Sequence, residues 1–168
     1  MGRAGYSESC WDGDIAALGW APNVRRCLAG KRGQAFLWEL YQALEALPRR
    51  ELITGVLQNS VGGVCALGAV AVARGVEIPT QFGVDADEDD DYEFQDALGP
   101  LLGIKDMLAR EVMYENDECG RWHFADTGEE IRGGINAHEK REVRRYETPA
   151  ERWQRMREWV VSHLKEKP

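Results

Sequence analysis

The clearest structural signal in the sequence is an apolar stripe within residues 34–47. Its large apolar side chains recur at spacings of three and four: Phe36, Leu37, Leu40, Tyr41, Leu44 and Leu47. This period places them on one face of an α-helix, and such a face must pack against other elements to leave water. Pro48 ends the helix, because proline disfavours the helical conformation of the residue before it. The stripe therefore predicts a helical fold around a buried core.

Two later stretches have the same period. Residues 104–116 predict a helix whose buried side carries Ile104, Leu108, Val112 and either Met107 or Met113. Thr148, Pro149 and Glu151 then form a helix start, with an N-cap, a proline at the first helical position and an acid three residues after the cap. We expect this last helix to bury Trp153, Met156, Val160 and Leu164. Its wet side is expected to carry Arg152, Arg155, Arg157 and Lys165.

The remaining segments are less regular. Residues 64–74 are rich in alanine and favour a short helix, preceded by a short hairpin around the turn at residues 59–62. A further short element starts at Phe94, follows acidic residues that suit a helix N-terminus, and is expected to end at Gly99 and Pro100. Residues 1–23 predict an irregular arm. In the basic stretch that follows it, Gly30 and Gly33 are expected to act as helix breakers. Residues 117–147 predict an irregular loop, with a small hairpin across residues 122–131.

Length and composition set the fold class. The 168 residues are 43% hydrophobic and 30% charged, which is typical of a globular chain that folds alone. We expect residues 1–168 to form one mainly α domain of about four to five helices with short β-hairpins. The four cysteines form no CxxC pair and follow no secretory signal, which favours reduced thiols in the cytoplasm. The longest apolar stretch, residues 61–73, is too short to cross a bilayer, so no membrane role is expected.

Charge is distributed unevenly along the chain. Residues 1–50 carry seven basic and five acidic groups, residues 51–131 carry four and eighteen, and residues 132–168 carry ten and six. The net charge of −8 therefore arises in the middle of the chain, which has a balance of −14. Phosphate binding requires clustered lysine and arginine, so this distribution does not favour a nucleic-acid partner. It favours a protein with a basic surface.

The densest acidic run has eight carboxylates within residues 85–96. It lacks the alternating ligand order and central glycine of a calcium loop, and we interpret it as a solvated, partner-binding face. The predicted face consists of Asp85, Asp87, Glu88, Asp89, Asp90, Asp91 and Glu93. Three arginines near the last helix, Arg141, Arg144 and Arg145, form a basic patch. They could balance the acidic run, either within the chain or across a homodimer.

No complete catalytic, metal or cofactor motif is present. The sequence Gly30-Lys31-Arg32-Gly33 lacks the earlier glycine and the hydroxyl residue of a phosphate-binding loop. His138 begins an incomplete HExxH pattern, because Glu142 stands where the second histidine is needed. We therefore predict no catalytic residue, no bound metal and no cofactor.

One cysteine and histidine set leaves an enzymatic alternative open. Cys119 and His123 have a metal-like spacing, which His138 with Asp117 or Asp126 could complete. A structural zinc site normally has paired ligands on both sides, and only one pair is present here. A small enzyme that uses these residues on a nucleotide or a protein requires them to converge with an acid in one pocket.

Several blocks of the sequence together resemble a family of small proteins encoded by tailed bacteriophages and prophages. They are residues 6–10 (YSESC), 30–37 (GKRGQAFL), 43–48 (ALEALP), 64–68 (VCALG), 114–118 (YENDE) and 147–153 (ETPAERW), with Met156, Arg157, Trp159 and Val160 after the last. The resemblance spans most of the chain. The acidic run and residues 132–145 differ from the family pattern.

The resemblance implies an origin but transfers no catalytic residue, because the family has no assigned activity. It implies an accessory protein in the bacterial host cytoplasm that binds and inhibits a host protein without enzymatic activity. Counter-defence, such as anti-CRISPR or anti-restriction action through acidic mimicry of nucleic acid, is the expected role. A Cys/His enzyme and a nucleic-acid binder that uses the C-terminal basic patch are the alternatives.

Overall fold

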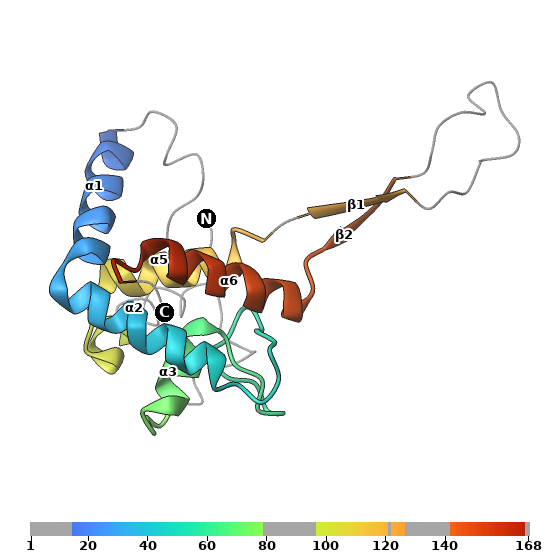
Figure 1. The fold of residues 1–168 in the computed structure, drawn as a ribbon, viewed down its shortest axis with the longest axis horizontal. Coiled ribbons are helices and arrows are strands. Elements are labelled where there is room, and N and C mark those ends of the chain that lie inside the picture. Colours follow the sequence, from blue (N-terminus) through green and yellow to red (C-terminus); the bar gives the residue numbers. More distant parts are fainter. Residues whose placement is uncertain (1–14, 79–96, 121, 127–141, 167–168) are drawn as a thin grey trace, which may run out of the picture.

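Helix α2 (Lys31–Glu45) contacts three other helices of the computed structural model, which describes residues 15–78, 97–120, 122–126 and 142–166 (Figure 1). Its apolar stripe is confirmed, with these residues buried: Phe36, Leu37, Leu40, Ala43 and Leu44. Tyr41 and Leu47 are partly buried against the same core. The stripe therefore provides the surface on which α1, α3 and α6 pack.

Helix α1 (Ile15–Ala29) shows that the prediction of an irregular arm over residues 1–23 was wrong from Ile15 onward, while residues 1–14 lie outside the described residues. Pro22 lies inside this helix. An internal proline costs a backbone hydrogen bond. The side chains of Val24 and Leu28, one helical turn apart, are buried in the core, and their packing offsets that cost. Tertiary contacts therefore decide the local structure here.

The two glycines between α1 and α2 have different roles. Gly30 is the extended N-cap of α2, so it separates the helices as predicted. Gly33 lies within α2 and is no breaker, which corrects the prediction. A Cβ atom at Gly33 would lie 2.0 Å from the Cys27 carbonyl oxygen, so glycine is needed for the close approach of α1 and α2.

Helix α3 (Ala66–Ala73) confirms the predicted alanine-rich helix and is buried along most of its length. The hairpin predicted before it is reduced to a single antiparallel bridge between Gln58 and Val64. The Asn116 side chain connects this region to α5, because it accepts a hydrogen bond from Ala66 N (3.1 Å) and donates one to Ile53 O (2.9 Å).

Residues 97–102 are helical, so Gly99 and Pro100 do not end this element as predicted. The left-handed conformation of Gly103, with φ of 60°, ends it instead. Helix α5 (Asp106–Asp117) follows and confirms the prediction for residues 104–116. Of the two candidate methionines, Met113 is fully buried and Met107 is partly buried.

Strands β1 (Trp122–Asp126) and β2 (Glu142–Tyr146) pair antiparallel, with Trp122 opposite Tyr146. The prediction of an irregular loop over residues 117–147 was therefore wrong at these two strands, and residues 127–131, the predicted second strand of the hairpin, lie outside the described residues. Glu-Val-Arg-Arg-Tyr contains few strand-forming residues, so local propensity did not reveal β2. This two-stranded ribbon extends away from the helices (Figure 1).

Helix α6 (Pro149–His163) has the predicted capping box between Thr148 and Glu151. The four apolar side chains assigned to the core are buried: Trp153, Met156, Val160 and Leu164. The Trp153 indole also donates a hydrogen bond to Leu44 O of α2 at 2.9 Å. The fold is mainly helical, as predicted. Among the described residues, no helix is long and apolar enough to cross a membrane.

Candidate functional site

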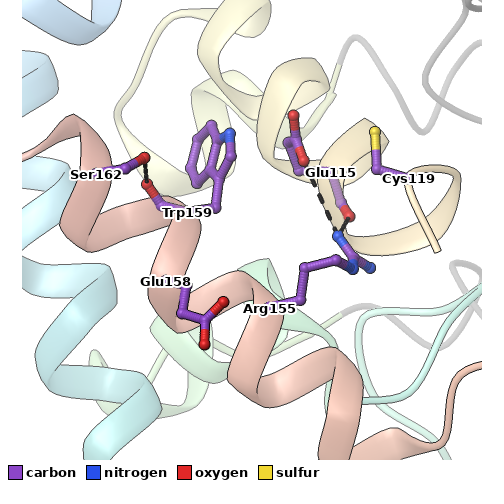
Figure 2. A pocket seen from close by; sticks show the side chains of 6 residues that line it. All are labelled: Glu115, Cys119, Arg155, Glu158, Trp159 and Ser162. Atoms are coloured by element: carbon purple, nitrogen blue, oxygen red, sulfur yellow. Dashed lines mark hydrogen bonds and ion pairs between the residues drawn. The ribbon is translucent and has the colours of Figure 1, made fainter. Parts of the chain in front are cut away.

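A pocket with a volume of about 330 Å³ lies between the end of α5 and the outer face of α6. Six residues line it: Glu115, Cys119, Arg155, Glu158, Trp159 and Ser162. Figure 2 shows Glu115 at the end of α5 and Cys119 just after this helix, while the other labelled side chains come from successive turns of α6. The pocket therefore depends on the packing of α5 against α6.

Arg155 is the central cation of this region. Its guanidinium donates to both carboxylate oxygens of Glu147, with Nη2 2.6 Å from Oε1 and Nε 3.0 Å from Oε2. It also donates to the backbone carbonyls of Glu115 and Asn116. These carbonyls belong to the last turn of α5, where the helix itself provides no backbone N–H to bond them. Arg155 thus caps α5 while it pairs with Glu147.

Glu147 and Arg152 complete a buried charge cluster with Arg155. The Glu147 side chain is 2% exposed, and those of Arg152 and Arg155 are 6% and 10% exposed. Arg152 donates to Leu52 O at 2.8 Å, and its Nε atom is 3.9 Å from Glu147 Oε1. The prediction that these two arginines lie on the wet side of the helix was wrong, because Glu147 and the carbonyls of other segments cover them, although the buried Arg152 Nε has no hydrogen-bond partner among the described residues.

Glu115 has a different environment from Glu147. Its nearest guanidinium contact is Arg155, with Nη1 3.9 Å from Oε2. Burial raises the pKa of the Glu115 carboxyl, and the nearby Glu111 carboxylate raises it further, while Arg155 only partly compensates. The pocket therefore contains an acidic group that the surrounding protein does not fully neutralise.

Cys119 does not have the properties of a catalytic thiol. Burial and the negative charge of Glu115 raise its pKa to about 12. A nucleophilic cysteine requires the thiolate at neutral pH, which this environment disfavours. His123 lies on β1 opposite Arg145, and His138 lies outside the described residues. Over the described ranges, no group of three or more His, Cys, Asp and Glu side chains could hold a metal ion.

Ser162 and His163 lie close together but do not form a nucleophile and base pair. The Ser162 hydroxyl is 2.7 Å from Trp159 O and donates its proton there. His163 Nδ1 lies 2.8 Å from the same carbonyl and 3.0 Å from Ser162 Oγ. Because Trp159 O and Ser162 Oγ both act as acceptors towards Nδ1, Nδ1 carries the proton of the imidazole ring. A protonated Nδ1 cannot accept the serine proton.

The predicted acidic face lies outside the described residues: Asp85, Asp87, Glu88, Asp89, Asp90, Asp91 and Glu93. Its predicted basic counterpart is described only at Arg145, which pairs with Glu151 at 2.6 Å. Arg145 and the capping hydrogen bonds from Thr148 lower the pKa of the Glu151 carboxyl. Arg145 is therefore engaged by the start of α6.

Sequence reasoning did not identify the pocket. Glu115 and Trp159 belong to blocks that carry the resemblance, and of the lining residues only Cys119 is a candidate site residue by sequence. A weak signal was available, because Trp159 and Ser162 are three residues apart, as are Arg155 and Glu158, so these pairs share a helical face. What the sequence could not supply was the helix that faces them.

Comparison with protein-family models, curated protein sequences and solved structures finds no match to this chain. The resemblance to bacteriophage proteins therefore stays a prediction.

Proposed function

We propose that this protein is a bacteriophage-encoded accessory factor without enzymatic activity, which binds a basic surface of a host protein in the bacterial cytoplasm. The acidic run within residues 85–96 supplies the contact. A line of closely spaced carboxylates resembles the charge of a nucleic-acid strand, so the partner is a protein whose basic groove normally holds nucleic acid. Inhibition of a host defence protein would follow from occupation of that groove.

The arginine pairing of the helices is the observation that carries this proposal. Arginines at the C-cap of α3, in β2 and in α6 are paired with carboxylates that lie outside the acidic run: Arg74 with Glu39, Arg145 with Glu151, Arg155 with Glu147 and Arg157 with Glu45. Each of these cations already has an anionic partner within the same chain. This supports an external cationic partner for the acidic run.

The chemistry of the described residues does not favour the enzymatic alternative. The Cys119 thiol is held in its protonated form, and the Ser162 hydroxyl is directed at a backbone carbonyl. Neither group is therefore activated as the nucleophile that covalent catalysis requires. A role in binding is therefore the function that these observations support best.

The proposal is tested by capture of host proteins with two matched variants. The first replaces Asp89, Asp90 and Asp91 with asparagine. The control replaces three exposed acids elsewhere, Glu51, Glu77 and Glu166, with glutamine. Both variants lose three negative charges, so a difference between them reports the position of the charge and not its sum.

The wild type and the control should retain the same host protein at about 0.1 M salt and lose it at about 1 M, where screening acts within a few ångströms. The first variant should fail to retain it at either concentration. Duplex DNA should compete for the captured protein. Equal retention by all three proteins, or no captured protein at low salt, would contradict the proposal.

A further inference from the structure

The α5–α6 pocket combines negative charge with an aromatic ring. Glu115 and Glu158 contribute carboxylates, and Trp159 contributes its indole (Figure 2). Among the described residues that line the pocket, Arg155 is the only cation. Whether the pocket is acidic therefore depends on how Arg155 distributes its hydrogen bonds.

Arg155 is largely committed to residues other than the two pocket acids. Its Nη2 atom is 2.6 Å from Glu147, whereas its Nη1 atom is 3.9 Å from the Glu115 carboxylate. Glu158 accepts a hydrogen bond from the neutral Gln154 amide at 3.0 Å. The described lining therefore carries two carboxylates against one guanidinium, and that guanidinium is closest to Glu147, outside the lining.

In the described part of the chain, no guanidinium group lies over the indole ring of Trp159. Within the described ranges, guanidinium groups lie over Trp153 (Arg50, 5.0 Å) and over Tyr41 (Arg157, 5.4 Å). Trp159 instead contacts the His163 ring, with centroids 4.7 Å apart. An indole attracts a cation more strongly than other aromatic rings do, and nearby carboxylates reinforce the attraction.

From this geometry we propose that the α5–α6 pocket binds an organic cation, an alkylammonium or alkylguanidinium group, between Trp159 and the carboxylates of Glu115 and Glu158. A volume of about 330 Å³ is at the small end of ligand pockets and suits one group the size of a lysine or arginine side chain. This site is separate from the acidic run, and either could exist without the other.

Other ligand classes fit the pocket less well. An anion would need free donors, but those of Arg155 are directed to Glu147 and to the end of α5. A hard metal ion prefers six or more oxygen ligands. The pocket offers two carboxylates and the Ser162 hydroxyl, which already donates its proton to a backbone carbonyl. The alkyl part of an organic cation can also cover the indole, which a metal ion cannot.

Titration with n-butylammonium, n-butylguanidinium and uncharged 1-butanol tests this proposal on the full chain. The indole N–H resonance of Trp159 reports binding in a heteronuclear NMR spectrum, and that of Trp38, on α2, serves as the control signal. The two cations should shift the Trp159 signal saturably with a dissociation constant on the order of 1 mM. 1-Butanol should not. An equal response to 1-butanol, or no saturable response to either cation, would overturn the proposal.

Matched variants locate the interaction. Glu158→Gln removes one exposed pocket charge and should weaken cation binding about fivefold, while Glu166→Gln should leave it unchanged. Trp159→Leu should abolish binding, with Trp38→Leu as its control. Trp159 packs partly against the core, so Glu158→Gln remains the decisive variant if Trp159→Leu does not fold. Wild-type affinity in Glu158→Gln would refute the site.

The source of the cation is resolved by comparing spermidine with the blocked peptide acetyl-Gly-Lys-Gly-amide. Tighter binding of the peptide assigns the pocket to a basic side chain of a partner protein, and tighter binding of spermidine assigns it to a free polyamine. Both results support the proposed chemistry, whereas binding of neither contradicts it. Failure here is distinguishable from failure of the proposed function, because the residues 89–91 variant keeps the pocket intact.

Discussion

Glutamine at position 147 should destabilise the fold far more than the loss of an ordinary surface charge. The Glu147 carboxylate lies between Arg155, at 2.6 Å, and Arg152, at 3.9 Å, and its side chain is 2% exposed. Glu147→Gln keeps the shape of the side chain and removes its charge. Arg152 would then lose its carboxylate partner and Arg155 would keep only its 3.9 Å contact with Glu115, and arginine cannot lose its proton to relieve the cost.

The expected loss is about 3 kcal/mol. Removal of one partner of a buried ion pair costs about 3–5 kcal/mol, because the other charge stays buried and uncompensated. The lower end of this range applies here. Arg155 keeps its hydrogen bonds to the carbonyls of Glu115 and Asn116, and Arg152 keeps its bond to Leu52 O.

Urea unfolding monitored by circular dichroism measures this loss, and Glu45→Gln is the matched control. Glu45 pairs with Arg157 and, at 3.5 Å, with Arg50, but all three side chains are about one third exposed or more, so its loss should cost less than about 1 kcal/mol. The slope of unfolding free energy against urea should be unchanged in both variants. If Glu147→Gln is as stable as Glu45→Gln, the charge cluster does not hold the fold together and the reasoning is wrong.

Thr148→Ala should lower the unfolding free energy by about 1 kcal/mol in the same urea assay, because it removes the N-cap of α6. Cys119 should react with iodoacetamide much more slowly than Cys27 at neutral pH, since its pKa is raised to about 12; peptide mass mapping measures both rates. Burial raises the pKa of Glu115, so its contribution to stability is lost as pH rises from the unfolded pKa to the higher folded pKa. Glu115→Gln should therefore gain stability relative to wild type as pH rises, and urea unfolding across a pH series would contradict this if the difference stays constant.

Local pattern was sufficient wherever one apolar face decides the structure. The stripe of α2 and the capping box of α6 were predictable because each depends on residues within a few positions of one another. The same holds for α5, whose period identified Leu108 and Val112 as core residues. Such elements are specified by short-range sequence alone.

Prediction failed where a distant segment decides the structure. The helical state of residues around Pro22 depends on the packing of Val24 and Leu28, and local proline rules oppose it. β2 pairs with a strand sixteen or more residues earlier in the chain, and nothing within its own sequence indicates that partner. Gly33 looked like a breaker because the backbone of α1 that it accommodates was not visible in the sequence.

The site was missed for a related reason. Helical periodicity places Arg155 away from the apolar face of α6 and Arg152 at its edge, four residues before Met156, but it could not show that other segments cover both side chains. Glu147 precedes the helix, and the α5 carbonyls come from about forty residues earlier in the sequence. A polar face predicts exposure only when nothing with matching hydrogen-bonding groups packs on it.

Arg155 links the stability of the fold to the character of the pocket. Its bonds to Glu147 and to the last turn of α5 fix the distance between α5 and α6, and that distance creates the cavity. The same bonds consume the donors that could otherwise neutralise Glu115. A less committed arginine would close onto Glu115 and leave Glu158 as the remaining pocket carboxylate. The Glu147–Arg155 pair therefore holds Arg155 at 3.9 Å from the Glu115 carboxylate while it joins α6 to the end of α5.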